Sequence, residues 1–288
     1  MLDLVASYAK LQLTPELGGG IAGLWCKDKP VLRPWSGNAA DGPFALASNV
    51  LVPFSNRIEN EFSFDGLTHV LPKNLDGEPF PIHGDGFQRP WLVAESGPTS
   101  ACLRLDKGEI GPFRYEAEQR FSLENNRLQM SLTMTNRAEL ALPYGGGFHP
   151  WFPRDAETRL QANAPEYWPE DDSHLPAFSS SQAPPPDFDF SSSQPLPERW
   201  INAGFSGWTG HAQISQGKAA VSVELTSQTL STAIIYSPEP QCGFFCFEPV
   251  SHPVNAHNLP GAPGLTVLQP GESLSFDMML TWDGDDAL

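Results

Sequence analysis

The sequence predicts an all-β protein built as a large antiparallel two-sheet β-sandwich. Proline makes up 29 of the 288 residues, about twice the usual share of ~5%, and prolines at this frequency interrupt helices. Apolar residues recur at every second position in several segments, which is the period of a strand with one buried face. Because these strands are too many for a seven-stranded sandwich, two larger sheets are expected.

The clearest element is a hairpin over residues 114–135. Polar and apolar residues alternate on both sides of a polar turn at 124–127. The apolar positions are Tyr115, Ala117, Phe121 and Leu123 before the turn, and Leu128, Met130, Leu132 and Met134 after it. This pattern predicts two antiparallel strands that share one buried face.

The stretch 165–197 differs from the rest of the chain. Serine runs at 179–181 and 191–193 flank three prolines at 184–186, and acidic residues add negative charge. This composition is typical of a long surface loop. We expect a solvated excursion, with a lid over a binding site as the alternative. Because nothing in the sequence separates two cores, residues 1–288 are expected to form one domain.

Three more strands are predicted in the last third of the chain. The two-residue period returns at 221–225 and at 276–282, where the second segment follows the turn Pro270-Gly271. Between them, an apolar run from Cys242 ends at Glu248, and the proline that follows keeps this glutamate out of the helical region. We therefore expect a buried strand that stops at a carboxylate.

Charge and composition narrow the partners. The chain has 17 basic and 34 acidic residues, a net charge of -17, which argues against nucleic acid and anionic membranes. No apolar stretch approaches the ~18 residues of a membrane helix, and the first residues lack the pattern of a signal peptide. A cytoplasmic protein with a neutral small-molecule ligand is expected, as a monomer or a homodimer.

The four cysteines do not suggest a disulfide scaffold or a zinc site. Cys26, Cys102, Cys242 and Cys246 lie mostly in apolar strand-like runs, and four cysteines in a chain this long are better explained as reduced core thiols. The histidines lack a compact ligand spacing such as His-Glu-x-x-His. We therefore expect no metal and no cofactor.

Three residues suggest acid–base chemistry. Glu248 stands at the end of an apolar run, where burial would raise its pKa toward neutrality. His83 precedes a glycine, and His149 follows three glycines at 145–147 that allow a close backbone approach to a ligand. Each histidine could also be a satisfied core residue.

Four segments, taken in order and spacing, resemble the aldose 1-epimerase (galactose mutarotase) family. They are Pro-Phe-Ser-Asn-Arg-Ile at 53–58, the His-Gly segment at 83–91, Gly-Phe-His-Pro-Trp-Phe at 147–152, and Phe-Glu-Pro-Val at 247–250 with Asn-Ala-His-Asn at 255–258. Residues 17–21 and 268–272 look like the family's terminal strands. The resemblance implies a β-sandwich that interconverts the α and β anomers of a free monosaccharide by opening the sugar ring.

The resemblance also implies roles for individual residues. Glu248 matches the family's general base and His149 its general acid, while Arg57 and His83 match residues that bind the sugar ring. Asn56 lies in the same segment as Arg57 and is a further sugar-binding candidate. The family usually has an aspartate where this chain has Asn202, followed by Ala-Gly-Phe. This departure is expected to affect substrate preference more than the reaction.

Aromatic residues near these motifs are candidates to stack on a sugar ring, with a place in the core as the alternative. They are Trp91, Trp151, Phe205 and Trp208. Four polar residues near the motifs are expected to be rim or structural residues: Asp85, Arg89, His252 and His257. Arg57 could instead pair with Glu59 or Glu61 on a surface strand.

Three other functions remain open from the sequence. A hexose-6-phosphate mutarotase could use Arg57 and Arg89 to bind phosphate, although the net charge of the chain does not attract phosphates. A non-catalytic sugar-binding protein could keep the pocket without the activity. A retaining glycosidase using Glu248 and Asp85 would need their carboxyl groups about 5–5.5 Å apart.

Overall fold

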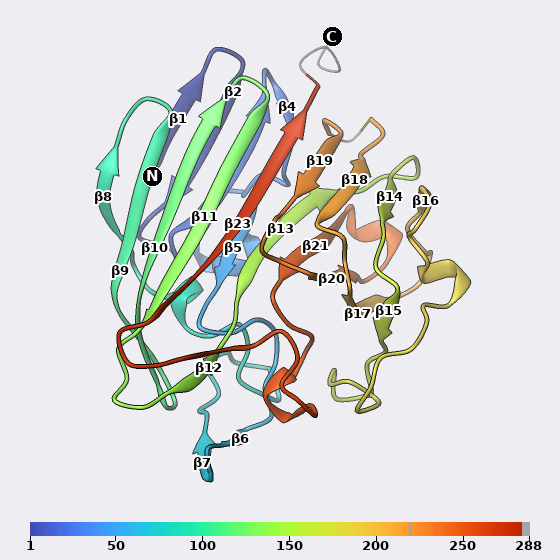
Figure 1. Cartoon of the computed structure of the whole chain (residues 1–288). Coiled ribbons are helices and arrows are strands. Elements are labelled where there is room, and N and C mark those ends of the chain that lie inside the picture. Colours follow the sequence, from blue (N-terminus) through green and yellow to red (C-terminus); the bar gives the residue numbers. More distant parts are fainter. Residues whose placement is uncertain (219, 284–288) are drawn as a thin grey trace.

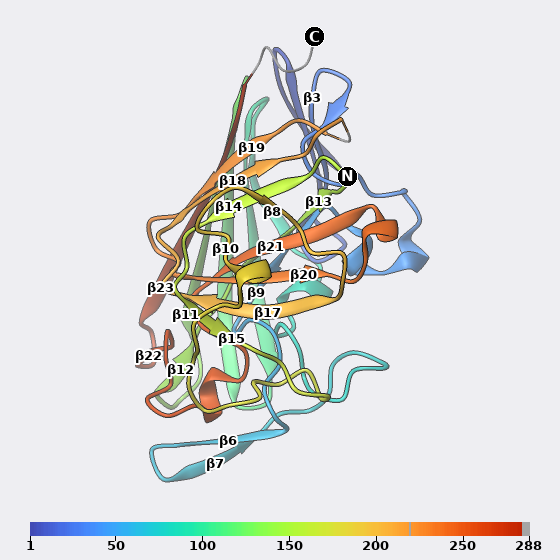
Figure 2. The same ribbon diagram turned by 90° about the vertical axis from the view of Figure 1, so that its right-hand side faces the viewer.

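Two large antiparallel sheets face each other in the computed structural model, which describes residues 1–218 and 220–283 (Figures 1 and 2). The expected all-β sandwich is confirmed. Within these residues the first sheet has ten strands, in the order β1-β2-β3-β5-β13-β21-β20-β17-β15, with β4 paired to β3. Their bounds are β1 Leu2–Ala6, β2 Ala9–Thr14, β3 Gly20–Cys26, β4 Lys29–Pro30, β5 Ser48–Leu51, β13 Gly147–Pro153, β15 Glu166–Trp168, β17 Ile201–Ser206, β20 Thr232–Ser237 and β21 Phe244–Val250.

The second sheet has nine strands in the described residues, in the order β16-β14-β18-β19-β23-β11-β10-β9-β8. Their bounds are β8 Leu92–Ser96, β9 Ser100–Ile110, β10 Phe113–Glu124, β11 Arg127–Asn136, β14 Arg159–Ala162, β16 Gln194–Pro195, β18 His211–Ser215, β19 Val223–Thr226 and β23 Ser273–Trp282. The predicted hairpin is confirmed as β10 and β11, which pair from Tyr115↔Asn136 to Glu124↔Arg127.

Short elements complete the chain. Two small sheets pair β6 (Glu61–Phe64) with β7 (Leu67–Val70) and β12 (Leu142–Tyr144) with β22 (Thr266–Leu268), and the β6–β7 hairpin projects from the body (Figure 2). Six 3-10 helices are described: η1 Ala39–Asp41, η2 Pro43–Ala45, η3 Gly86–Gln88, η4 Pro186–Phe188, η5 Pro240–Cys242 and η6 Ala256–Asn258. No helix in the described part of the chain is long and apolar enough to cross a membrane.

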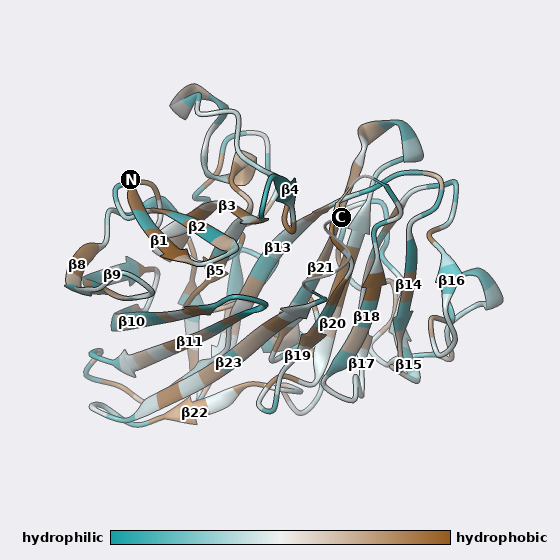
Figure 3. Cartoon of the chain, turned by 90° about the horizontal axis from the view of Figure 1, so that it is seen from above, coloured by the Kyte–Doolittle hydropathy of each residue, from teal (hydrophilic) through white to brown (hydrophobic). Residues whose placement is uncertain are grey.

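The core lies between the two sheets. Along β10, β11 and β23, hydrophobic and hydrophilic residues alternate (Figure 3), and the hydrophobic positions are buried. The alternation follows from the strand period of two, which sends successive side chains to opposite faces of the sheet. The second sheet therefore has one buried face and one exposed face.

The strands β13 and β21 differ because every described residue in them is at least half-buried. Phe148, Phe152, Phe245 and Phe247 face the sandwich core. The alternate residues, including His149 and Glu248, therefore lie on the outer face of the first sheet, which loops cover. Burial on both faces explains why the sequence of β21 reads as a continuous apolar run.

The predicted end of this strand was wrong. β21 continues past Glu248 to Val250, and Pro249 pairs with Ala233 in the ladder of β20. A proline adopts the extended backbone of a strand, so it does not by itself end one. Glu248 thus lies inside a strand of the first sheet, between two neighbouring strands that hold it.

The three glycines before His149 allow close approach to other parts of the protein. A Cβ atom on Gly146 would lie 2.4 Å from the carbonyl oxygen of Leu51, and one on Gly147 would lie 2.2 Å from that of Pro249. A Cβ on Gly145 would meet the ring of His252 at 2.2 Å. The expected close approach is present, but the partner is the protein itself.

The stretch 165–197 is only partly the solvated loop that its composition predicts. It contains β15, η4 and β16, and Phe188, Phe190 and Leu196 are buried in the core. Isolated apolar residues anchor a segment whose average composition is polar. The cysteines are all free and three are buried, but Cys242 is exposed at the end of η5 and is not a core thiol.

Candidate active site

His149 and Glu248 lie opposite each other on neighbouring strands. β13 and β21 pair as Gly147↔Val250 and Trp151↔Cys246, so the same register places His149 across from Glu248. Opposite residues of an antiparallel pair have Cβ atoms only about 4.5–5.5 Å apart. Accordingly, His149 Nε2 lies 3.3 Å from Glu248 Oε1. The two residues are 99 positions apart in the chain, so no local sequence pattern indicates that they form a pair.

His83 reaches the same place from a loop. Its backbone has a positive φ of 59°, and Asn56 has one of 52°, and the two residues bond to each other. The His83 N–H donates to the Asn56 carbonyl oxygen at 2.9 Å, and the Asn56 N–H donates to His83 Nδ1 at 3.0 Å. Because Nδ1 accepts, a neutral His83 carries its proton on Nε2. The ring centroid lies 5.1 Å from that of His149.

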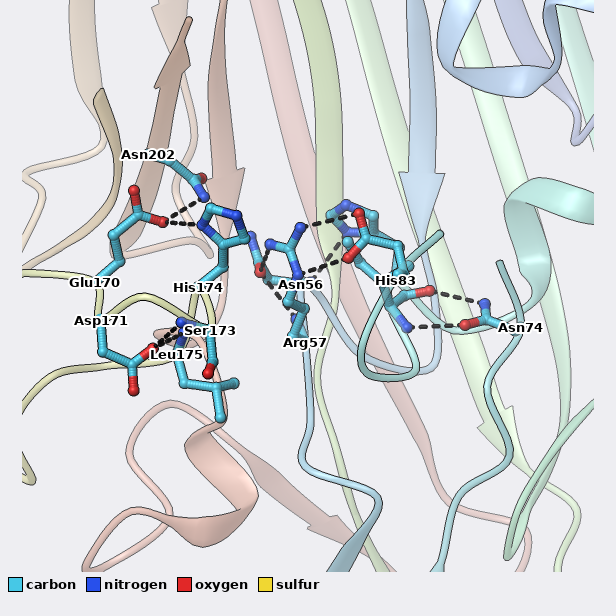
Figure 4. Close-up of polar contacts among 12 residues, drawn as sticks. Asn56, Arg57, Asn74, His83, Glu170, Asp171, Ser173, His174, Leu175 and Asn202 are labelled. Atoms are coloured by element: carbon cyan, nitrogen blue, oxygen red, sulfur yellow. Dashed lines mark hydrogen bonds and ion pairs between the residues drawn. The ribbon is translucent and has the colours of Figure 1, made fainter. Parts of the chain in front are cut away.

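Arg57 is held by an ion pair that differs from the alternative considered from the sequence. Its Nε and Nη2 donate to Glu78 at 2.8 and 3.0 Å, and not to Glu59 or Glu61. The bidentate geometry fixes the plane of the guanidinium group. Its Nη1 lies 3.4 Å from Asn56 Oδ1, which also accepts from the Arg57 N–H at 2.9 Å. Figure 4 shows these contacts.

These groups line a pocket of about 560 Å³ on the outer face of the first sheet. That volume lies within the ~300–1,000 Å³ of typical small-molecule sites. Of the candidates from the sequence, the lining includes Asn56, Arg57, His83, His149, Trp151, Asn202 and Glu248. The sheet explains the gathering, because β13, β21, β20 and β17 are consecutive neighbours.

Burial shifts the proton equilibria of the pair. It raises the pKa of Glu248 well above its usual range, with Arg57 opposing the effect. Burial also lowers the pKa of His149 to about 3. The direction for Glu248 agrees with the sequence-based expectation. Without a ligand, both directions place the pair's proton on the carboxyl group and leave the imidazole neutral.

The pKa of His83 is also lowered, first by burial and then by His149 and Arg57.

Two atoms of the pair formed by His149 and Glu248 have no hydrogen-bond partner among the described residues, namely His149 Nδ1 and Glu248 Oε2. Buried polar atoms without partners are rare in folded proteins. Both atoms belong to residues that line the pocket.

Three aromatic candidates lie elsewhere. Trp208 packs on Phe247 in the core, with ring centroids 5.4 Å apart, and its indole N–H donates to the His211 carbonyl oxygen. Trp91 is buried and donates to the Gly86 carbonyl oxygen, and Phe205 faces the core. Trp208 lies in the loop after β17, is buried in the core and does not line the pocket. Trp151 does line the pocket, stacked on His149 with centroids 5.0 Å apart.

The four residues expected to be structural have such contacts. Asp85 accepts from the Tyr115 hydroxyl at 2.6 Å and from the Glu109 N–H at 2.9 Å, and it pairs with Arg89. His252 Nε2 accepts from the Ser55 N–H at 3.0 Å. His257 Nε2 donates to the Pro143 carbonyl oxygen at 2.9 Å. None of the four lines the pocket.

A metal could be held by one set of described side chains. His83, His149 and Glu248 offer ligand atoms that all lie within 4.8 Å of one another. The lack of a compact ligand spacing in the sequence was the reason for expecting no metal, yet these three residues converge from distant segments. His83 Nδ1 is engaged by the Asn56 N–H, so His83 could ligate only through Nε2. The expectation of a metal-free site remains a prediction.

Comparisons with known proteins agree with this architecture. A family model described as aldose 1-epimerase matches residues 12–281. The uncharacterized protein YphB of Escherichia coli (strain K12) is 34% identical over 285 residues, which cover 95% of this chain and 96% of YphB. The chain belongs to the aldose 1-epimerase family. A crystal structure of a proposed aldose 1-epimerase from Escherichia coli K12 has a TM-score of 0.91 at 32% identity, with 98% of both chains covered.

A more distant member of this fold is the galactose mutarotase-like protein of Clostridium acetobutylicum. Its structure has a TM-score of 0.84 at 18% identity and covers 98% of this chain and 94% of its own. A likeness at this identity supports the shared fold. Membership of the aldose 1-epimerase family thus explains the two-sheet architecture. The chemistry of the site depends on the side chains that line the pocket.

The sequence analysis missed several of the residues that line this pocket. They are Phe44, Glu78, Asp172, His174, Trp200 and Tyr236. Trp200 is 43% exposed, which is unusual for so large an apolar ring. Its neighbourhood at the end of a polar loop gave no sequence signal. Tyr236 lies opposite Asn202 in the ladder of β17 and β20, a register that no local pattern in the sequence gives.

Proposed function

We propose that the protein interconverts the α and β anomers of a free monosaccharide, with Glu248 as general base and His149 as general acid. The observation that carries this proposal is the buried contact of 3.3 Å between His149 Nε2 and Glu248 Oε1 at the wall of a sugar-sized pocket. The reaction requires one base and one acid close to the same anomeric centre. The family assignment supports the reaction class.

The proton steps fit this pair. Glu248 takes the proton from the anomeric hydroxyl, the bond between C1 and the ring oxygen breaks, and His149 gives a proton to the ring oxygen. After rotation about the C1–C2 bond, the ring oxygen attacks the other face of C1. His149 then recovers its proton and Glu248 returns one to O1.

The resting protonation of the pair suits the reaction in one further way. A protonated Glu248 beside a neutral His149 has the same net charge as a carboxylate beside an imidazolium. A sugar that binds can therefore convert the first form into the working form by moving one proton across the contact, without a proton from solvent. Hydrogen bonds from the anomeric hydroxyl to the carboxylate favour this working form.

The rest of the pocket supports binding of the sugar. His83 presents Nε2–H, and Arg57 and Asn56 lie beside it, so this wall offers donors to the sugar oxygens. Arg57 is already paired with Glu78, and Arg89 with Asp85, so neither is a free phosphate ligand. Asp85 lies outside the pocket, which does not support a glycosidase pair with Glu248.

The test is polarimetry of freshly dissolved α-glucose, α-galactose and related aldoses. The wild type should speed equilibration, and Glu248→Gln should lower kcat by at least about 100-fold, because a general base contributes ~10²–10⁴ in rate. Glu224→Gln, at an exposed position of β19, is the matched control and should keep wild-type activity. Retained mutarotation in Glu248→Gln, or no acceleration by the wild type, would refute the proposal.

The same assay addresses metal. We expect EDTA to leave the rate unchanged, since proton transfer alone moves the anomeric centre. If a stoichiometric metal is found and its removal abolishes turnover, the three possible ligands His83, His149 and Glu248 would have to be reassigned as a metal centre.

A further inference from the structure

The carboxylate of Glu170 organises the end of the pocket that the loop 165–197 provides. Its Oε2 accepts from Asn202 Nδ2 at 2.8 Å and lies 2.7 Å from His174 Nδ1, and its Oε1 accepts from the indole N–H of Trp200. Figure 4 shows Asn202 and His174 both turned toward Glu170. Glu170 itself does not line the pocket, whereas the other three residues do.

These contacts fix the hydrogen-bonding roles of the lining groups. A carboxylate can only accept, so His174 must donate from Nδ1, and its neutral ring keeps Nε2 as an acceptor. The amide of Asn202 must turn its nitrogen toward Glu170. Its Oδ1 receives no hydrogen bond from the described residues and is left as an acceptor for a ligand.

The local backbone holds this arrangement in place. Asp171 Oδ1 accepts from the Ser173 and Leu175 N–H groups at 2.8 and 3.1 Å. Leu175 is buried in an apolar cluster with Leu51, Ile234 and Val250. The turn that carries His174 is therefore anchored in the protein, and the loop is a fixed wall of the pocket.

The sheet register places this wall away from the acid–base pair. Asn202 on β17 lies opposite Tyr236, which lies opposite Cys246 on β21. Asn202 is thus two strands from the strand of Glu248, a distance of about 10 Å at ~4.8 Å per strand. A pyranose whose anomeric carbon lies at Glu248 would extend its remote hydroxyl groups toward Asn202 and His174.

The charge of this wall also favours a neutral sugar. Glu170 is ion-paired with no lysine or arginine in the described structure, and the exposed Asp172 lines the pocket nearby. Among the described residues, Arg57 alone supplies a lysine or arginine to the pocket lining, and it is paired with Glu78. An anionic substituent at the remote end would meet like charge without a basic partner.

We propose that Glu170 is a positioning residue that sets Asn202 and His174 as acceptors, so that the pocket selects neutral aldoses with a free hydroxyl remote from the anomeric carbon. Deoxy sugars that lack this hydroxyl, and uronic acids, are disfavoured. This inference rests on the proposed function for the orientation of the sugar. The aspartate usual in the family would lie against the carboxylate of Glu170, so Asn202→Asp should lower kcat/KM.

The test compares wild type and Glu170→Gln on a parent aldose, a series of deoxy analogues lacking one hydroxyl each, and the uronic acid. The glutamine places an NH₂ group against N–H donors and breaks the network. For the parent sugar, KM should rise about tenfold, equivalent to one hydrogen bond, while kcat stays within about threefold. For the deoxy analogue that the wild type penalises most, KM should not change.

Asn202→Ala is the second variant, because it removes the acceptor and leaves Glu170 in place. It should lose the same discrimination, and the double variant should lose no more than either single one. Asp187→Asn is the control, since this acidic residue belongs to the same loop but pairs with the exposed Arg199. It should behave as the wild type.

Equal KM changes for the parent and every deoxy analogue would show a merely structural role for Glu170 and overturn the inference, as would a wild type that penalises no deoxy sugar. The same ratios measured as Kd by calorimetry separate this inference from the proposed function. If the wild type binds selectively without turnover, the proposed function fails and the selection by Glu170 stands. If the wild type turns over every sugar alike, the proposed function stands and the selection by Glu170 fails.

Discussion

Glu248 combines catalytic suitability with a cost in stability. The side chain is 2% exposed, and burial in a protein interior disfavours the charged carboxylate. In the unfolded chain the group ionises near its ordinary pKa, so at neutral pH folding must supply a proton to it. This proton uptake destabilises the fold. The same raised pKa lets Glu248 exchange a proton near neutral pH, and shifted pKa values are common at functional sites.

Glu248→Gln should therefore stabilise the protein while it removes activity. Glutamine is neutral in both states, so it avoids the proton uptake. Because the pKa is raised on folding, the stabilisation should be absent below pH 4.5 and should grow as pH rises above it. We expect an increase in Tm of about 2–4 °C at pH 8, the effect of ~1 kcal/mol in a domain of this size, and a smaller one at pH 5.

Calorimetric scans at both pH values measure this difference, with Glu224→Gln as the exposed control. An unchanged or lower Tm for Glu248→Gln at pH 8 would mean that the carboxyl group is stabilised by contacts other than those described.

At the scale of elements, the sequence predicts strands better than it predicts their partners. The alternation of residues 114–135 depends only on local periodicity, and it gave the hairpin β10–β11 correctly. Pairing of β13 with β21 depends on contacts across about 100 residues, and no local pattern records it. The pocket wall formed by Glu170 and His174 could not be predicted either. The loop is polar on average, so its composition does not reveal that the buried Leu175 anchors it.

Aromatic residues show a second limit. Trp151 and Trp208 were equal candidates in the sequence, but Trp151 lies on the outer face of β13 and lines the pocket, whereas Trp208 lies in the loop after β17 and is buried in the core. The face of the sheet on which a strand residue lies is fixed by the register of that strand with its neighbours. The sequence drew attention to His149 and Glu248 because ionisable side chains are unusual in a buried strand, whereas aromatic residues are common on both faces.

Gly147→Ala tests the role of this register. A Cβ at this position would lie 2.2 Å from the Pro249 carbonyl oxygen and 2.8 Å from the Val250 Cα, and backbone atoms of a central strand cannot move aside cheaply. The two strands should shift apart where His149 faces Glu248. We expect kcat to fall at least about tenfold, because a 1 Å misplacement can cost ~10² in rate.

Polarimetry measures the loss, and Gly97→Ala provides the control. A Cβ on Gly97 would make only an ordinary contact of 3.4 Å, with the side chain of Ser100. Full activity in Gly147→Ala would show that the contact between His149 and Glu248 tolerates a displaced strand.

At the scale of the whole molecule, burial of neutral histidines couples folding to pH. Four histidines have pKa values lowered by burial: His83, His149 at about 3, His252 at about 4 and His257 at about 3. His83 and His149 belong to the pocket, whereas His257 packs against Phe54 and Phe62, and His252 packs against His257. The architecture that shields the acid–base pair therefore also makes the fold sensitive to acid.

The expected result is a free energy of unfolding that falls steeply between pH 6.5 and 4. Each lowered pKa contributes stability that is complete above the unfolded value of 6.5 and is lost as pH falls toward the folded value. The slope per histidine is up to about 1.36 kcal/mol per pH unit, and Glu248 opposes it with the contrary sign above pH 4.5. His257→Gln, whose amide can still donate to the Pro143 carbonyl oxygen, should reduce the slope by about one proton, whereas the exposed His211→Gln should not. Urea unfolding at a series of pH values gives both slopes, and an unchanged slope in His257→Gln would show that this histidine is protonated in the folded protein.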